Sequence, residues 1–310
     1  MDSDEASAEV PRLGISPPWD LWRETPERQR ALLARIADGG INHLFVADHV
    51  SFKGGNGSDG LIHLAALSGL EPRLDLVLGV FLLALRHPVV AARQIATLAE
   101  AVPGRLTVGV GVGGEDRSEF LACGVDPATR GRRTDAALAI IRPLLAGEAV
   151  SWDDDLFQLD RVRVRSGVRE TVPIVVGGRA DPALVRTARH GDGWLGAWTS
   201  ADRFATGVAR VAELAPERSE PWIHGLQLWV GVGRDADEGR RHVAEGLEGF
   251  YKMPFAPFER YTPCGTAADI AAFLRPYVEA GATMLNLTPV GPSREAEIDT
   301  TADVAALLTA

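Results

Sequence analysis

Short apolar runs recur along the chain, each bounded by glycine, proline or charged residues. Runs of this length and setting are typical of buried strands. Eight segments fit the description: 13–16, 42–47, 74–83, 105–112, 173–177, 193–198, 222–232 and 283–288. The runs at 74–83 and 173–177 are almost continuously apolar, as expected when both faces of a strand are buried.

Segments with helical periodicity separate most of these runs. From 88 to about 102, apolar residues recur at the spacing of one helix face. Thr25-Pro26 and Asp181-Pro182 each join a capping side chain to a proline, which is tolerated in the first turn of a helix. Further helices are predicted near 134–145, 200–214, 235–250, 266–280 and 295–308.

The alternation of strands and helices predicts a parallel sheet covered by helices. Eight such units in 310 residues favour a closed (β/α)₈ TIM barrel. No linker rich in proline, glycine or serine divides the chain, so we expect one domain over 1–310, with 1–11 flexible. The stretch 148–171 breaks the rhythm, and its alternating pattern predicts a two-stranded excursion inserted before the fifth strand.

Composition and charge narrow the class of protein. Hydrophobic residues make up 46% and charged residues 24%, as in a globular enzyme, and the net charge of −10 argues against a nucleic-acid partner or an anionic membrane surface. No apolar run approaches the roughly 20 residues that span a bilayer, and the acidic N-terminus does not have the form of a signal peptide. Cys123 and Cys264 lie far apart in the sequence, so we expect reduced thiols in a cytoplasmic protein.

The second apolar run ends in two ionisable residues, Asp48 and His49, before a glycine-rich loop. Barrels of parallel strands place their chemistry at the carboxyl ends of the strands. His49 there is a candidate acid or base, and Asp48 a candidate ligand contact. The alternative is a helix-capping aspartate followed by a surface histidine.

Glycines mark two other strand ends. Gly177 and Gly178 precede a predicted helix start, where backbone N–H groups attract phosphate, and Arg179 adds positive charge. Gly113 belongs to a strand end with little side-chain bulk, where a planar cofactor can lie. The alternative for Gly177 and Gly178 is a tight strand-to-helix turn, and the alternative for Gly113 is a solvated loop.

Two further strand features complete the candidates. Gly79 interrupts an apolar strand, which predicts a bulge or a close backbone approach. Glu115 and Asp116 follow the fourth strand, where one carboxylate can face the site. The histidines form no HxH or HExxH pattern and no GxSxG occurs, so neither a metal site nor a serine hydrolase is expected.

Several motifs together resemble the luciferase-like monooxygenase superfamily, in particular its coenzyme F420-dependent oxidoreductases. They include GINHLFVADH, LGVFLLALRHPVVAARQIATL, GRLTVGVGVGG and PIVVGGRADPALVRTARHGDGW, and the resemblance runs from about Leu13 to Leu307. It implies a TIM barrel with insertions that transfers a hydride between F420 and a small organic substrate. An FMN-dependent monooxygenase using reduced flavin and O₂ is the alternative, and a non-catalytic binding barrel is a third reading. Homodimers are common in that family, so a homodimer remains an open expectation.

The resemblance also implies roles for individual residues. Asp48 matches an acidic residue that contacts the deazaflavin, and His49 matches a proton donor or base. Glu115 falls near a second acid/base carboxylate, with Asp116 as the alternative one residue later. The resemblance places a non-prolyl cis peptide behind the cofactor ring at Gly79-Val80.

At the later turn, Gly177, Gly178 and Arg179 fall on the segment that holds the cofactor phosphate in that family.

The loop after His49 departs from the branch that oxidises sugar phosphates. That branch has a tryptophan a few residues after its Asp-His pair, where this chain has Phe52 and Lys53. Its lysine pair for the substrate phosphate also has no clear counterpart, so we do not expect a sugar phosphate. Trp19, Phe52 and Trp198 fall in predicted strand-end loops, where they either line an apolar substrate pocket or serve packing.

Overall fold

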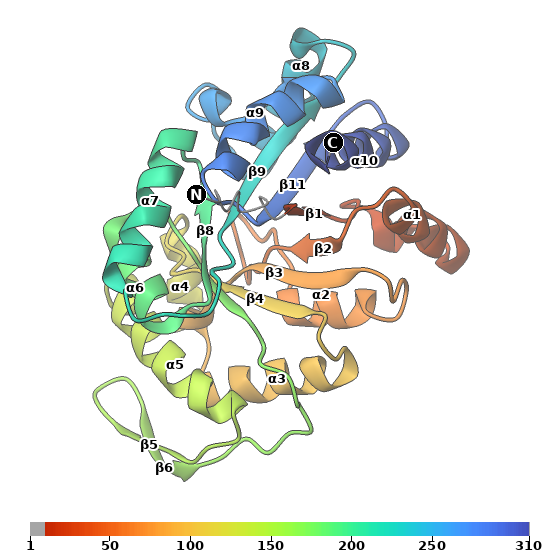
Figure 1. Ribbon diagram of the computed structural model, residues 1–310. Coiled ribbons are helices and arrows are strands. Elements are labelled where there is room, and N and C mark those ends of the chain that lie inside the picture. The colour runs from red at the N-terminus through yellow and green to blue at the C-terminus, as the bar shows by residue number, and fades with distance from the viewer. Residues whose placement is uncertain (1–9, 310) are drawn as a thin grey trace, which may run out of the picture.

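Eight parallel strands form a closed barrel in the computed structural model, which describes residues 10–309 (Figure 1). The strands are β1 (Arg12–Ile15), β2 (His43–Val46), β3 (Asp75–Phe81), β4 (Leu106–Val110), β7 (Ile174–Gly177), β8 (Gly193–Ala197), β9 (Gly225–Val232) and β11 (Met284–Val290). The barrel closes because β8 pairs with β9, β9 with β11 and β11 with β1. Each predicted run overlaps one of these strands, so the predicted TIM barrel is confirmed.

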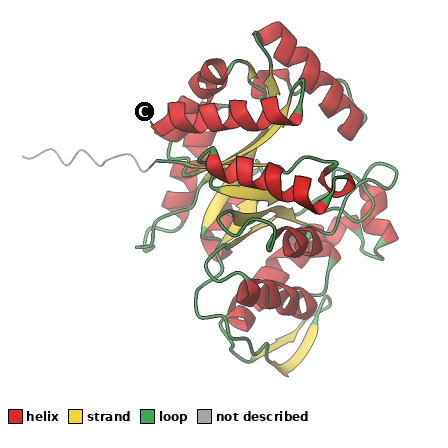
Figure 2. Cartoon of the chain, turned by 90° about the vertical axis from the view of Figure 1, so that its right-hand side faces the viewer, coloured by secondary structure: helices red, strands yellow, loops and turns green. Residues whose placement is uncertain are grey.

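Helices surround the barrel on its outside (Figure 2). They are α1 (Pro26–Asp38), α2 (Gly60–Leu67), α3 (Pro88–Ala101), α4 (Arg117–Ala122), α5 (Arg130–Leu145), α6 (Asp181–His190), α7 (Ala201–Leu214), α8 (Ala236–Tyr251), α9 (Ala267–Glu279) and α10 (Arg294–Thr309), with short 3₁₀ turns at Leu21–Arg23, Leu83–Leu85, Pro127–Thr129 and Glu259–Tyr261. Thr25 caps α1 as predicted, with its hydroxyl accepting the N–H of Arg28 at 3.3 Å. The expected cap at Asp181 is wrong: Ala180 occupies the cap position, and Asp181 is the first helical residue.

Three smaller elements complete the chain. Strands β5 (Val150–Asp153) and β6 (Gln158–Val162) pair antiparallel and project from the barrel at the lower left of Figure 1, where the excursion over 148–171 was predicted. Helix α2 was not predicted. Strand β10 (Cys264–Gly265), which lies beside β9, was not predicted either. Of the segment 1–11 that we expect to be flexible, residues 1–9 lie outside the described part of the chain.

The barrel interior combines apolar packing with a chain of hydrogen bonds. His43 on β2 lies 2.7 Å from Asn286 on β11, and the Asn286 amide donates to Gln227 on β9 at 3.5 Å. Gln227 in turn donates to the carbonyl of Gly79 on β3 at 3.0 Å. Four strands are thereby linked through polar side chains, and the last hydrogen bond is to the backbone of β3. We refer to His43, Asn286 and Gln227 as the floor chain.

The predicted irregularity at Gly79 is present. The Gly79–Val80 peptide bond is cis, and the register between β3 and β4 shifts between Leu78 and Phe81. A Cβ at position 79 would lie 2.5 Å from the Gln227 amide oxygen, so a larger residue would force Gln227 to shift within the floor chain. The bulge therefore lies where the interior hydrogen bonds reach the carboxyl ends of the strands.

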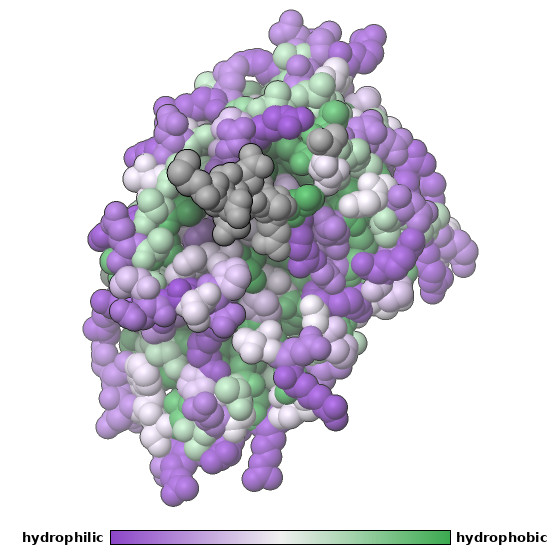
Figure 3. Space-filling model, viewed as in Figure 1, coloured by the Kyte–Doolittle hydropathy of each residue, from purple (hydrophilic) through white to green (hydrophobic). Residues whose placement is uncertain are grey.

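The outer surface is largely hydrophilic. Figure 3 shows hydrophilic residues around the rim of one face and hydrophobic residues nearer its middle. Among the described residues, no helix combines the length and apolar character needed to cross a membrane.

Candidate active site

An open cavity of about 260 Å³ lies at the carboxyl ends of the barrel strands. Its lining comes from β3, β7, β8 and β9, from the loops that follow β2 and β4, from α4 and from the end of α8. Most of the residues singled out in the sequence line it: Asp48, His49, Phe52, Gly79, Val80, Gly113, Glu115, Asp116, Gly177, Gly178 and Trp198. The structure thus brings together candidates that lie up to 150 positions apart in the chain.

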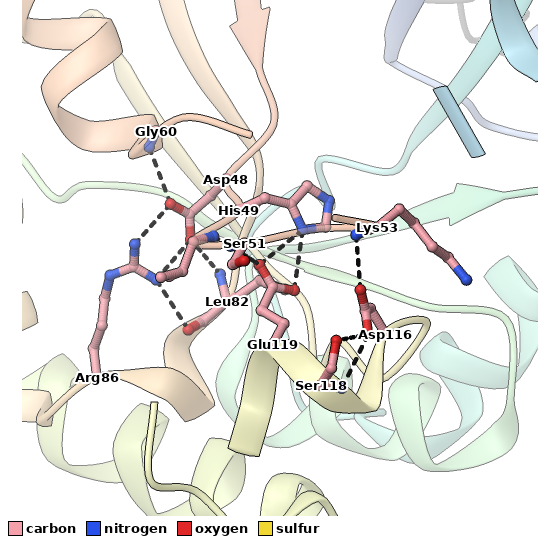
Figure 4. A network of polar contacts seen from close by, with 11 residues as sticks. Asp48, His49, Ser51, Lys53, Gly60, Leu82, Arg86, Asp116, Ser118 and Glu119 are labelled. Atoms are coloured by element: carbon pink, nitrogen blue, oxygen red, sulfur yellow. Dashed lines mark hydrogen bonds and ion pairs between the residues drawn. The ribbon is translucent and has the colours of Figure 1, made fainter. Parts of the chain in front are cut away.

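The side chain of His49 is held by a carboxylate that we did not predict, Glu119 on α4 (Figure 4). The imidazole Nδ1 lies 3.2 Å from Oε2 of Glu119, and Oε1 accepts the N–H groups of Val50 at 2.7 Å and Ser51 at 3.1 Å. The Glu119 side chain is 2% exposed and that of His49 is 18% exposed. A buried carboxylate on Nδ1 holds the ring in one orientation and leaves Nε2 free for a proton.

Asp48 is buried beside His49, and protein groups occupy its carboxylate. Arg86 donates to both of its oxygens at 2.7 Å, and the N–H groups of Gly60 and Leu82 add two bonds at 3.0 Å each. Burial raises the pKa of the Asp48 carboxyl, while Arg86 and the two N–H groups oppose that shift. Asp48 therefore joins the loop after β2 to the start of α2 and the end of β3.

Two further carboxylates stand at the cavity, Glu115 and Asp116. Asp116 caps α4, where it accepts the Ser118 N–H at 2.9 Å, and it also accepts the Lys53 N–H at 2.7 Å. The Ser118 hydroxyl also donates to Asp116, at 2.5 Å. This hydroxyl bond, followed by the bond from the Lys53 N–H, lowers the pKa of Asp116. Asp116 thus fixes the loop after His49, whereas the carboxylate in contact with the histidine is Glu119.

Glycines give one part of the cavity a wall without side chains. A Cβ on Gly111 would meet Cγ2 of Val80 at 2.4 Å, and one on Gly177 would meet Cγ1 of the same valine at 2.9 Å. Gly113 and Gly178 have φ of 61° and 135°, which disfavours any other residue. The residues present therefore fit a flat ring system laid against the backbone.

A second cleft, of about 410 Å³, adjoins the first at Trp198. Arg179 lines it, together with Arg203 and Arg210 on α7. The indole of Trp194 donates to the carbonyl of Gly178 at 2.5 Å and so fixes the turn between the two clefts. Arg179 thus lies at the second cleft, next to the glycine turn rather than inside the first cavity.

The aromatic candidates separate into two groups. Phe52 is fully buried and Trp198 partly so, and both line the cavity. Trp19 does not: its side chain is 83% exposed and stacks beside Arg23. The expectation that Trp19 lines the pocket is therefore wrong, since position in a strand-end loop does not fix where the side chain points.

Among the described residues, no group of three or more His, Cys, Asp or Glu side chains is placed to hold a metal ion.

A sequence profile of the luciferase-like monooxygenase family matches residues 9–289. An uncharacterized protein of Mycobacterium tuberculosis is 33% identical over 197 residues, covering 61% of this chain and 67% of its own. The 4-hydroxyprotoasukamycin monooxygenase of Streptomyces nodosus subsp. asukaensis is 28% identical, and the match covers 75% of this chain and 60% of that enzyme. An F420-dependent glucose-6-phosphate dehydrogenase of Nakamurella multipartita is 27% identical, with 55% and 52% covered, so the match spans about half of that enzyme.

Among solved structures, an F420-dependent secondary alcohol dehydrogenase, in complex with an F420-acetone adduct, superposes with a TM-score of 0.80. The match covers 95% of this chain and 98% of that one at 18% identity. At this identity the likeness establishes a shared fold.

Proposed function

The chain belongs to the luciferase-like monooxygenase family, and we propose that it is a coenzyme F420-dependent oxidoreductase acting on a small organic substrate. Its relatives include F420-dependent oxidoreductases and monooxygenases, and it is an enzyme of that type.

The observation that carries the proposal is the pair formed by His49 and Glu119 at the cavity wall. Oxidation of an alcohol releases a hydride from carbon and a proton from oxygen, and the reverse reaction takes up both. A histidine whose Nδ1 faces a buried carboxylate at 3.2 Å presents Nε2 as the group that takes or returns that proton.

The glycine-lined wall supports a deazaflavin as the partner in hydride transfer. F420, when bound, supplies the atom that accepts or donates the hydride. Gly79, Val80, Gly111 and Gly113 would lie along its ring. The turn after Gly177 and Gly178, with Arg179 beside it, leads into the start of α6 and would hold its phosphate.

An FMN-dependent monooxygenase is the second candidate, favoured by the 28% identity to a monooxygenase over 75% of the chain. The same glycine wall and phosphate turn accommodate either cofactor. The alternatives differ in what they require of His49, because hydride exchange with an alcohol or carbonyl needs a proton partner at the reacting oxygen.

Titration of the purified protein with F420 and with FMN tests the proposal, followed by turnover with an alcohol or ketone panel. We expect micromolar F420 binding and turnover without O₂. His49→Ala should lower turnover by about 10²-fold or more while leaving F420 affinity nearly unchanged. His63→Ala is the matched control, since His63 lies on α2 and hydrogen-bonds Trp22 outside the cavity. Binding of FMN but not F420, or full turnover in His49→Ala, would overturn the proposal.

A further inference from the structure

Aromatic side chains make up a second part of the cavity lining. Five of them face the cavity, and we refer to them as the aromatic wall: Phe52, Trp198, Trp229, Phe250 and Tyr251. They come from the loop after β2, the end of β8, strand β9 and the last turn of α8. Helix α8 ends there because the next residue, Lys252, adopts the left-handed conformation with φ of 54°.

The rings of the aromatic wall contact one another in a continuous series that begins at His49. Phe52 lies 4.3 Å from the His49 ring centroid and stacks on Phe250 at 5.5 Å. Phe250 continues to Trp229 at 5.8 Å and to Tyr251 at 5.0 Å. An aromatic surface therefore extends outward from the proton-transfer residue.

Most ionisable side chains around the cavity are acidic. Within the described chain, the residues lining it include no lysine or arginine, but four carboxylates: Asp48, Glu115, Asp116 and Glu119. Of these, Asp48 is paired with Arg86. Such surroundings disfavour an anion, since like charges brought together in a partly dry cleft repel.

The phenol of Tyr251, a polar group of the aromatic wall, remains uncharged near neutral pH. Burial raises the pKa of the Tyr251 phenol, and the negative charge of Glu115 raises it further. A neutral phenol can donate a hydrogen bond to a carbonyl or hydroxyl oxygen.

From these observations we propose that the substrate is a flat, uncharged molecule of one or two rings carrying a carbonyl or hydroxyl group. Its ring stacks on the aromatic wall, and its oxygen lies toward His49. This substrate class rests on the oxidoreductase function proposed above. Because the described lining has no cationic side chain, we also expect weak binding of substrates that carry a phosphate or carboxylate beside the aromatic wall.

Three probe compounds test the proposal: 2-acetylnaphthalene, 2-naphthoate and cyclohexyl methyl ketone. Their affinities are measured by calorimetry with the full chain, loaded with whichever cofactor binds and also without cofactor. We expect 2-acetylnaphthalene to bind most tightly and the anion 2-naphthoate at least tenfold more weakly. The measurement reports binding, so exclusive FMN binding would overturn the proposed function and still leave this ranking to be tested.

Substitutions then test the aromatic wall itself. Phe250→Leu keeps apolar bulk but removes the ring, and should weaken 2-acetylnaphthalene roughly two- to tenfold while hardly affecting the cyclohexyl ketone. Glu115→Gln should narrow the gap between 2-naphthoate and the neutral ketone. Trp19→Ala is the matched control, because Trp19 is exposed outside the cavity.

Three results would overturn the proposal. The first is that 2-naphthoate binds as tightly as the ketone, or that none of the compounds binds with or without cofactor. The second is that Phe250→Leu weakens both ketones equally, which would indicate packing alone. The third is that Trp19→Ala weakens binding as much as Phe250→Leu does.

Discussion

Replacing Glu119 with glutamine keeps the size of the side chain and removes the negative charge that faces His49. In the folded chain Glu119 receives two backbone N–H bonds, at 2.7 and 3.1 Å, besides its contact with the imidazole. With 2% of the side chain exposed, solvent cannot replace the lost charge. The substitution should therefore act on both the orientation of His49 and the stability of the loop after β2.

The size of the effect follows from the contacts. A hydrogen bond to a charged group contributes about 1.5–3 kcal/mol. If most of the free energy of the Glu119–His49 hydrogen bond is lost in the transition state for proton transfer, turnover falls about 10- to 100-fold. A difference of about 1.4 kcal/mol corresponds to a factor of ten. The two N–H bonds to Val50 and Ser51 lose their charge assistance as well, so Glu119→Gln should also unfold at a lower denaturant concentration.

A double-mutant cycle separates catalysis from general damage to the loop. Turnover is compared for the natural chain, Glu119→Gln, His49→Gln and the double variant, all with F420 saturating. If Glu119 acts through His49, it should matter little once His49 is gone, and the coupling energy should be at least about 1 kcal/mol. Equal losses from Glu119→Gln in both backgrounds, or no loss in either, would refute the reasoning.

Three other changes test different parts of the site. Asp48→Asn removes the buried charge that Arg86 contacts at 2.7 Å and leaves Arg86 only its longer ion pair with Asp59 at 3.3 Å. It should cost about 3 kcal/mol of unfolding free energy, measured by urea denaturation, and a loss below about 1 kcal/mol would contradict this account. Burial raises the pKa of Glu297 from 4.5 to about 7. The unfolded chain therefore loses this proton at lower pH than the folded one, and stability falls as pH rises from about 4.5 to 7, by at most about 3 kcal/mol. Glu297→Gln should match the natural chain at pH 4 and exceed its melting temperature at pH 8, and an equal difference at both pH values would exclude this cause. Gly111→Ala places a Cβ 2.4 Å from a valine methyl group of the cavity wall and should weaken cofactor binding in a titration, whereas Gly249→Ala, with open space around it, should not.

The barrel was predictable because each of its strands is a short apolar run bounded by residues that end strands. Helix α2 was missed because GLIHLAAL is apolar on nearly every side, which hides the periodicity that reveals a helix. Strand β10 has only two residues and offers no pattern to recognise.

The site was predictable where position along a strand fixes position in space. Asp48 and His49 directly follow β2, and Gly177 ends β7, so the barrel carries them all to one end. Glu119 lies 70 residues after His49 on a short helix, and nothing in the local sequence shows which way its side chain turns. The placement of Glu115 as a second acid/base group, which rested on family spacing, stays a prediction, and Glu119 joins it as a candidate.

The floor chain has a consequence for how this enzyme can change over time or be redesigned. Its three side chains form one continuous circuit from β2 through β11 and β9 to the Gly79 carbonyl, and the His43 ring fills the space that a side chain on Gly14 would need. Altering any one of the three leaves the others with unmatched donors or acceptors, and His43 and Asn286 are buried where solvent cannot replace the lost partner. We therefore expect the bottom of the pocket to change only as a unit, and new specificities to arise by exchange of aromatic side chains at the rim, which lie outside this hydrogen-bonded chain.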